Sequence, residues 1–267
     1  MNLREIITDA IKFPISDTRK FLIFCALIII MSLSIVLPSY GLKNNTLALI
    51  LSLVTLIFIF VVLGYLFEVI KGGTEGEDTL PDFDYVKHFV IGVKAMILDI
   101  IYFIIPAVIV IIVASATGLF SSFTKIVYVG IDAVANETTN VTTIIAAVPK
   151  STMNTFTNAL SVTLIVAIIL FLIFSLLSFT AMVRFAKSGS GTEGLRFIEI
   201  IKDMSRIGFI KIIVTLIVIY IIALALVFAI ALIGLIPYIG VFISIFVGVP
   251  FVLLFLYRAI GLLYAEA

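Results

Sequence analysis

The sequence predicts an all-α integral membrane protein with six transmembrane helices, three cytoplasmic interfacial amphipathic helices and a pseudo-threefold repeat of one interfacial helix and two spans. Three observations predict this class: 63% of the 267 residues are apolar, only 12% are charged, and the mean hydropathy is +1.35. A soluble domain carries roughly twice that share of charged residues, because charges cover its surface. The net charge of +1 gives no electrostatic basis for binding nucleic acid.

Six apolar stretches are long enough, at about 20 residues, to cross a bilayer as helices. We expect the whole chain, 1–267, to form one transmembrane domain. The first stretch is a retained anchor and not a signal peptide, because residues 37–40 offer no small-x-small cleavage site. Gly and Pro within 234–240 let the last two stretches form a helical hairpin. The predicted spans are 21–37, 46–67, 91–115, 159–183, 209–234 and 239–261.

Lys and Arg are distributed unevenly between the two sides of the membrane. Of the 17, only Lys43, Lys125 and Lys150 fall on one side, and the other 14 lie on the side of both termini. Cytoplasmic loops carry the excess of Lys and Arg, so both termini are predicted in the cytoplasm of a cell-membrane protein. Segments 38–45 and 116–158 are then extracytoplasmic.

Three N-x-Ser/Thr sequons, at Asn44, Asn136 and Asn140, all fall in the predicted outside segments. They are candidate glycosylation sites, although Asn- and Thr-rich loops also contain such sequons by chance. Segment 116–158 has further order, because its apolar residues recur at helical spacing. We expect a helix that lies on the outer leaflet or caps the bundle, followed by a polar loop at 136–140. The apolar residues are Phe120, Phe123, Val127, Ile131 and Val134.

A short amphipathic segment precedes the first, third and fifth spans. The first and last copies share a Glu-Ile-Ile-x-Asp core, at 5–9 and 199–203, and 84–87 is a looser third copy. This pattern predicts helices that lie on the cytoplasmic membrane surface. The apolar stripe of the first copy is Leu3, Ile6, Ile7, Ala10 and Ile11, and the polar, water-facing stripe of the last is Arg196, Glu199, Asp203 and Arg206. Capping boxes at 79–82 and 190–193 are expected to start the second and third segments.

Signatures of catalysis are missing from the sequence. One histidine excludes paired-histidine metal sites, and one cysteine, Cys25, excludes thiolate clusters and an intrachain disulfide. The acidic residues of 78–84 lie together in one Pro-containing loop, which favours a solvated capping loop over a magnesium site. We therefore expect no cofactor, no metal and no enzymatic activity.

Four charged residues lie within the predicted spans or next to their cytoplasmic ends, near the inner leaflet: Glu68, Asp99, Arg184 and Arg258. A charge costs roughly 2.5 to 3.5 kcal/mol near mid-membrane and less at this depth. We expect a structural layer in which Asp99 pairs with Arg258 or Arg184. The alternative is coupling of this layer to a proton or an anionic solute.

Span six carries small residues, Gly240, Ser244 and Gly248, at successive i+4 positions. Such a groove lets another helix approach closely. We expect it to pack inside the chain, against Ala225 and Ala229 of span five, and dimerisation is the alternative.

Six short segments carry a family resemblance: 64–70, 80–84, 92–94, 206–208, 235–240 and 257–261. Together they resemble the archaeal multi-pass membrane proteins of domain-of-unknown-function family 4013. The resemblance implies a multi-pass membrane protein with no assigned activity and no catalytic residues.

Two functions are compatible with these observations. The first is a non-enzymatic membrane module that binds membrane lipids or a protein partner, because amphipathic segments recur and no polar constellation lies at mid-membrane. The alternative is a small secondary transporter or channel. The repeat, the charged layer and possible helix breaks at Pro106 and Pro250 motivate it.

Overall fold

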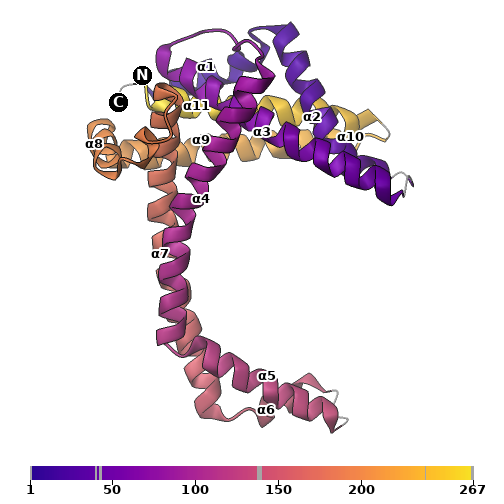
Figure 1. Cartoon of the computed structure of the whole chain (residues 1–267), viewed down its shortest axis with the longest axis vertical. Helices are drawn as coiled ribbons and strands as arrows, with labels where there is room; N and C mark the ends of the chain where they lie inside the picture. The colour runs from indigo at the N-terminus through magenta and orange to yellow at the C-terminus, as the bar shows by residue number, and fades with distance from the viewer. Residues whose placement is uncertain (1, 40, 42–43, 137–139, 238, 266–267) are drawn as a thin grey trace. The chain divides into compact units, whose positions relative to one another are not determined.

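A computed structural model of the chain (Figure 1) describes all residues except 1, 40, 42–43, 137–139, 238 and 266–267. The regular structure of these residues is entirely helical, and six helices are long and apolar enough to cross a membrane. The predicted class, an all-helical chain with six membrane-length helices, is confirmed. The six are α2 (Thr18–Ser39), α3 (Asn45–Glu75), α4 (Tyr85–Ala116), α7 (Lys150–Ser188), α9 (Phe209–Gly234) and the stretch Ile239–Leu263.

Several of these helices are longer than the predicted spans. Helix α3 continues past 67 to Glu75, where Gly76 takes a left-handed conformation with φ of 77° and ends it. Helix α7 begins at Lys150, directly after Pro149, instead of at 159. Hydropathy marks only the hydrocarbon-embedded part, whereas backbone hydrogen bonding continues through polar residues until a residue such as Gly or Pro interrupts it.

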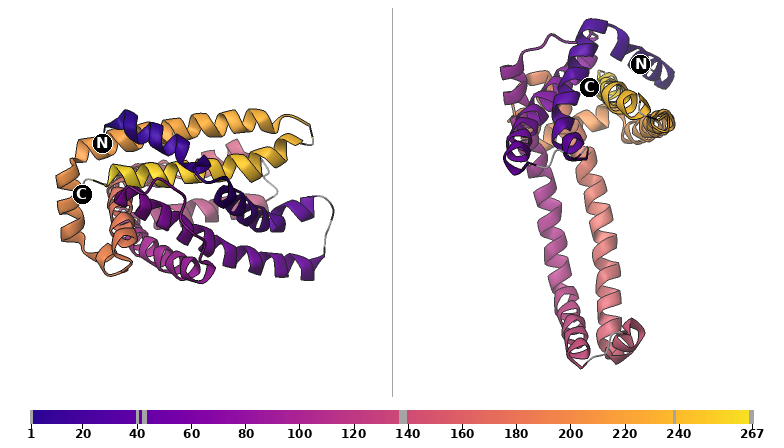
Figure 2. Two further views of the ribbon diagram at one scale, coloured as in Figure 1. Left: turned by 90° about the horizontal axis from the view of Figure 1, so that it is seen from above. Right: turned by 90° about the vertical axis from the view of Figure 1, so that its right-hand side faces the viewer.

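The chain was expected to form one domain, and its contacts divide into two compact units, 1–99 with 179–267, and 100–178. The first unit holds two apolar cores. One lies between α2, α3 and α11 (Val249–Leu263) and includes Phe24 and Tyr65, both fully buried. The other lies between α1 (Leu3–Lys12), α9 and α11 and includes Ile6 and Phe255. Figure 2, left, shows α1 in indigo beside α9 in orange and α11 in yellow.

The second unit contains α5 (Leu119–Ala135), α6 (Val141–Ala147) and the adjoining parts of α4 and α7. The rings of Phe103 and Phe171 stack with centroids 6.0 Å apart, which joins α4 to α7. Helix α5 confirms the helix predicted in the first half of 116–158, whereas α6 was not predicted. Part of the expected polar loop, 137–139, lies outside the described residues. The predicted apolar stripe of α5 is exposed at all five positions, Phe120, Phe123, Val127, Ile131 and Val134.

Two of the three expected amphipathic segments are separate helices, α1 and α8 (Phe197–Ile207). The third prediction is wrong: residues 85–87 are the first turn of α4, because the Asp84 carboxylate accepts the backbone N–H of Lys87 at 3.0 Å and starts that helix. The capping box expected at 79–82 is therefore also wrong. Helix α1 does not present its whole apolar stripe to the surface, since Ile6 and Ala10 pack against α9 and α11.

Two glycines allow helices α3 and α4 to touch along their backbones. A Cβ atom added at Gly64 of α3 would lie 1.8 Å from the carbonyl oxygen of His88, and one at Gly92 of α4 would lie 1.9 Å from that of Phe60. The two glycines therefore fix the crossing of α3 over α4, because no side chain fits between the helices.

The small residues of span six pack within the chain. This span consists of α10 (Ile239–Ile243), a π-helical turn (Ser244–Gly248) and α11. A Cβ at Gly240 would lie 2.1 Å from the carbonyl oxygen of Ile233, and the Ser244 hydroxyl donates to the carbonyl of Ile230 at 2.8 Å. Ile230 also contacts the position of Gly248. The nearest atoms on α9 thus belong to Ile230 and Ile233 and not to Ala225 and Ala229.

Candidate functional site at the charged helix ends

Three of the four charged residues predicted near the inner leaflet, Glu68, Arg184 and Arg258, lie near the ends of α3, α7 and α11. These three ends contact one another, and we call them together the charged end. The contacts are a tilted ring pair of Phe67 and Phe185 at 5.4 Å, a hydrogen bond of 2.9 Å between Thr180 and Tyr264, and a backbone approach of Gly261 to Gly73. Arg258 and Arg184 are bound by residues of the segments before α2 and α9, and Glu68 is bound by a residue in the first turn of α4.

Arg258 of α11 is the largest fully buried side chain, with 1% of its surface exposed. Its Nε donates to Asp9 Oδ1 at 2.7 Å and its Nη2 to Asp9 Oδ2 at 3.2 Å, so α1 binds it through both carboxylate oxygens. Its Nη1 donates to the carbonyl of Glu77, and the Phe13 ring centroid lies 4.4 Å from the guanidinium carbon. Each of the three nitrogens of the buried guanidinium therefore donates a hydrogen bond, and an aromatic ring covers one of its faces.

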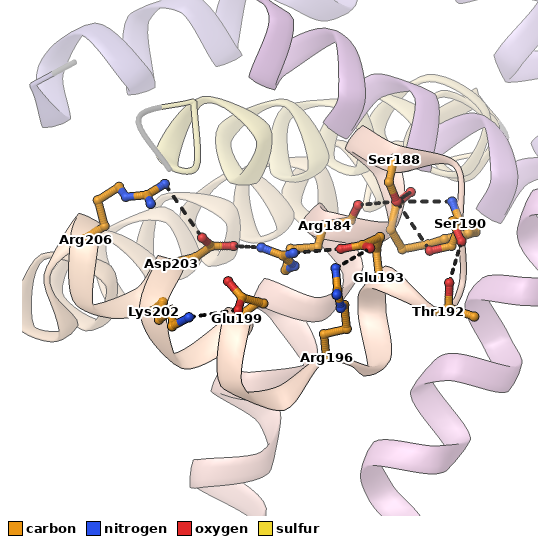
Figure 3. Close-up of polar contacts among 11 residues, drawn as sticks. Arg184, Ser188, Ser190, Thr192, Glu193, Arg196, Glu199, Lys202, Asp203 and Arg206 are labelled. Atoms are coloured by element: carbon orange, nitrogen blue, oxygen red, sulfur yellow. Dashed lines mark hydrogen bonds and ion pairs between the residues drawn. The ribbon is translucent and has the colours of Figure 1, made fainter.

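Arg184 of α7 lies between two carboxylates (Figure 3). Its Nη2 donates to Glu193 at 2.8 Å and its Nη1 to Asp203 of α8. Arg196 donates to the other oxygen of Glu193 at 2.9 Å, and Arg206 lies 3.9 Å from Asp203. Two sequence interpretations are corrected here. Asp203 is buried and does not lie on the water-facing stripe, and Glu193 binds arginines instead of completing a capping box.

In the third pair the two charges are exchanged, so that the acid lies near the end of the long helix and its partner is a base. Glu68 of α3 accepts Lys87, from the first turn of α4, at 2.9 Å. The Glu68 side chain is 16% exposed and that of Lys87 is 52% exposed, so solvent screens this pair more than the other two.

We call these three pairs clasps. In two of them a helix that precedes a membrane-length helix contacts the second helix of another hairpin, because α1 contacts α11 and α8 contacts α7; in the third, the first turn of α4 itself contacts α3. Asp9 and Asp203 are the last residues of the two Glu-Ile-Ile-x-Asp cores. The expected pairing of Asp99 with Arg258 or Arg184 is wrong, because these arginines bind Asp9, and Asp203 with Glu193. Asp99 itself is half-buried on α4.

Asp9 is the functional residue that the sequence interpretation missed. It lies outside the predicted spans, where water solvates a charged side chain and placing one costs little free energy. The available signal was its position three residues after Ile6 and one before Ala10, both of which are buried, on the face that turns toward the spans.

The acidic loop 78–84 is folded against α2 and α3. Leu80 is buried, the Tyr65 hydroxyl donates to the carbonyl of Pro81 at 3.2 Å, and the Lys20 ammonium donates to the carbonyl of Leu80 at 2.7 Å. Lys20 also lies 2.8 Å from Asp82, and this hydrogen bond lowers the pKa of the Asp82 carboxyl. Within the described residues, no three His, Cys, Asp or Glu side chains form a group that could hold a metal.

The three predicted glycosylation sites are exposed residues at helix ends. Asn44 and Asn140 cap α3 and α6, accepting the backbone N–H groups of Leu47 at 3.0 Å and Thr142 at 2.9 Å. Asn136 follows α5, and the threonine of its sequon, 138, lies outside the described residues. Glycosylation stays a prediction.

Two cavities open beside the clasps. The first, of about 310 Å³, is lined by Arg184, Glu193 and Asp203 together with Lys187 and Arg206. The second, of about 410 Å³, lies between the ends of α3 and α7 and the start of α4. We call it the lysine pocket, after its lining residues Lys71, Lys87, Lys94 and Lys187.

Six membrane-length helices with exposed apolar side chains define a multi-pass membrane protein. The chain belongs to the family described as "Protein of unknown function (DUF4013)", whose profile matches residues 47–236. This confirms the family resemblance found in the sequence. The matched range includes Glu68 and Arg184, whereas the Asp9–Arg258 clasp lies outside it. No curated protein and no solved structure matches the chain.

Proposed function

We propose that this protein is a non-enzymatic membrane module that binds lipid at the charged end, which lies in the cytoplasm together with both termini. The clasps carry this proposal. They hold α1 and α8 against the ends of the spans, where the apolar side chains that these segments leave exposed meet the membrane interface. Ile15, beside α1, is 64% exposed, and Ile198 and Ile201 of α8 are 72% and 50% exposed.

The clasps also support a pseudo-threefold arrangement. In this arrangement each hairpin, α2 with α3, α4 with α7, and α9 with α10 and α11, binds the segment that leads into the next hairpin. Breaking a buried ion pair by removing one partner is costly, because the other charge stays buried. The ion pairs therefore hold each amphipathic segment at one defined position against the helix ends and keep its exposed apolar face in a fixed orientation.

A transporter or channel remains the second candidate because of one observation. The sixth span is interrupted by the π-helical turn Ser244–Gly248, directly before Pro250. Such turns replace regular backbone hydrogen bonds and occur frequently at functional sites. A transporter would use this irregularity with Asp99 as its ionisable group.

The two functions are separated by measuring bound lipid and ion flux on the same preparation. The full chain is purified in detergent, the lipid phosphorus retained per chain is measured after size exclusion, and the chain is then reconstituted into liposomes with an internal pH dye. We expect retained lipid, and proton flux equal to that of protein-free liposomes.

A proton flux that Asp99→Asn abolishes would support the transporter. A chain that retains no lipid but co-purifies with a stoichiometric protein would replace lipid by a protein partner. Either result would overturn the proposal.

A further inference from the structure

The lysine pocket combines a basic rim with an apolar wall. Four lysines line it, and Glu68 is its one acidic lining residue. Glu68 is bound to Lys87 at 2.9 Å, and Lys71 lies 3.9 Å from Glu75, outside the lining. In the described part of the chain, Lys94 makes no ion pair. The lining therefore carries three more positive than negative charges, in a cavity of about 410 Å³.

The wall of the pocket is hydrocarbon. Phe67 and Phe185, each 1% exposed, lie in it with their rings in contact. Val86 and Val90 of α4 extend the wall outward and are 76% and 44% exposed. The same helix face carries the exposed Lys94 and then Ile97, which is 50% exposed, so an apolar stripe interrupted only by Lys94 runs from the pocket along a membrane-length helix.

The cavity beside Arg184 provides an internal comparison. Its lining sets Arg184, Lys187 and Arg206 against Glu193 and Asp203, so its positive charge is largely neutralised. The difference follows from the reversed clasp. At the Arg184 clasp α8 contributes an acid, whereas at Glu68 the first turn of α4 contributes Lys87, so the lining of the lysine pocket contains four lysines and one carboxylate.

We propose that the lysine pocket binds the phosphodiester group of an anionic phospholipid, whose acyl chains lie along Val86, Val90 and Ile97. The site requires both features: clustered lysines attract a phosphate, and the stripe accepts hydrocarbon that a soluble anion does not have. This inference rests on the proposed function and assigns its ligand class and site.

The test measures lipid binding to the full chain by native mass spectrometry from detergent micelles. The probes are dioleoyl phosphatidylglycerol, dioleoyl phosphatidylcholine with the same chains, and inorganic phosphate as competitor. The pocket variant combines Lys71→Gln, Lys94→Gln and Lys187→Gln and keeps Lys87, so that the clasp stays intact. The control variant has the same change in net charge through lysines outside the pocket, Lys12→Gln, Lys125→Gln and Lys202→Gln.

Each lysine near an anionic surface contributes about fivefold in affinity, so we expect the pocket variant to bind phosphatidylglycerol about a hundredfold more weakly. The control should bind like the parent chain, and phosphatidylcholine should bind weakly to all three. Circular dichroism spectra and melting curves verify that both variants are folded.

Three results would overturn the lysine pocket: equal loss of binding in the two variants, equal binding of the two lipids, or displacement of phosphatidylglycerol by inorganic phosphate at equal concentration. The last would indicate a site for a soluble anion. A parent chain that retains lipid without preference would leave the proposed function standing, whereas one that retains no lipid would remove that function as well.

Discussion

Neutralising Asp9 should release α1 from the spans, because it leaves the most buried charge of the protein without its counter-charge. Arg258 is 1% exposed, and removing one partner of a buried ion pair typically costs about 3–5 kcal/mol. The Asp9 side chain is 30% exposed, so solvent screens part of the interaction, and the Glu77 carbonyl and the Phe13 ring remain in place. We therefore expect Asp9→Asn to lower the free energy of unfolding by about 2–3 kcal/mol.

A double-mutant cycle separates this pairing from a general loss of charge. Unfolding in detergent is followed by circular dichroism for Asp9→Asn, Arg258→Gln and the double variant. The double variant should lose about 2 kcal/mol less than the sum of the single losses, because the second change removes the charge that the first had stranded.

The matched control cycle uses Asp99→Asn with Arg258→Gln and should be additive within about 0.5 kcal/mol. Additive losses in the Asp9 cycle would refute the assigned role of the clasp. A coupling found only in the Asp99 cycle would restore the pairing that the sequence suggested.

Three further perturbations test other parts of the structure. Gly64→Ala should lower the free energy of unfolding by at least about 2 kcal/mol, because its Cβ would lie 1.8 Å from the His88 carbonyl oxygen. The control Gly130→Ala in α5 meets no atom within 4 Å and should be neutral or stabilising. Equal melting points of the two variants would contradict the α3–α4 contact. Exchanging Glu68→Lys with Lys87→Glu should restore the stability that Glu68→Lys alone loses, and a double variant no better than the single would argue against this clasp. In a Cys25→Ser chain, Ser121→Cys and Ser205→Cys should react with an impermeant maleimide from opposite faces of the membrane, since both sites are exposed. Reaction of both from the same face would contradict the predicted topology.

The loop 76–84 should also respond to pH through Asp82. Lys20 lowers the pKa of this carboxyl, so the contact stabilises the loop fully above the ordinary pKa of about 4 and is lost as the pH falls through the lowered value. Asp82 is fully exposed, so we expect a small increase in hydrogen exchange of the loop below pH 4 that is missing in Asp82→Asn. A parent chain and a variant with the same pH profile would contradict this assignment.

Hydropathy was sufficient to predict six membrane-length helices, because a lipid-facing side chain is apolar whichever helix lies next to it. The partners of Arg184 and Arg258 could not be found in this way. Asp9 is 249 positions away from Arg258 and lies in the short helix α1, outside the predicted spans. Asp203 was assigned to the polar stripe because it follows Glu199 by four residues. Asp203 also follows the buried Ile200 by three residues and so borders the apolar face. Its ion pair with Arg184 holds it on that side.

The helix ends were harder to predict for a local reason. The residues 79–82 have the spacing of a capping box, but Leu80 is drawn into the core between α2 and α3, and this leaves Asp84 to start α4. A tertiary contact thus overrides a local pattern of four residues.

The reversed polarity of the Glu68–Lys87 clasp has a consequence for how the hairpins find their neighbours during membrane insertion. Three identical acid-to-arginine clasps would be interchangeable, and nothing in them would tell one hairpin from another. The observed pairs are Asp9 with Arg258, Lys87 with Glu68 and Asp203 with Arg184. If all three segments moved to the next helix end in either direction, Lys87 would meet an arginine and an aspartate would meet Glu68. Both of these arrangements contain two repulsive contacts, so the reversed pair disfavours them.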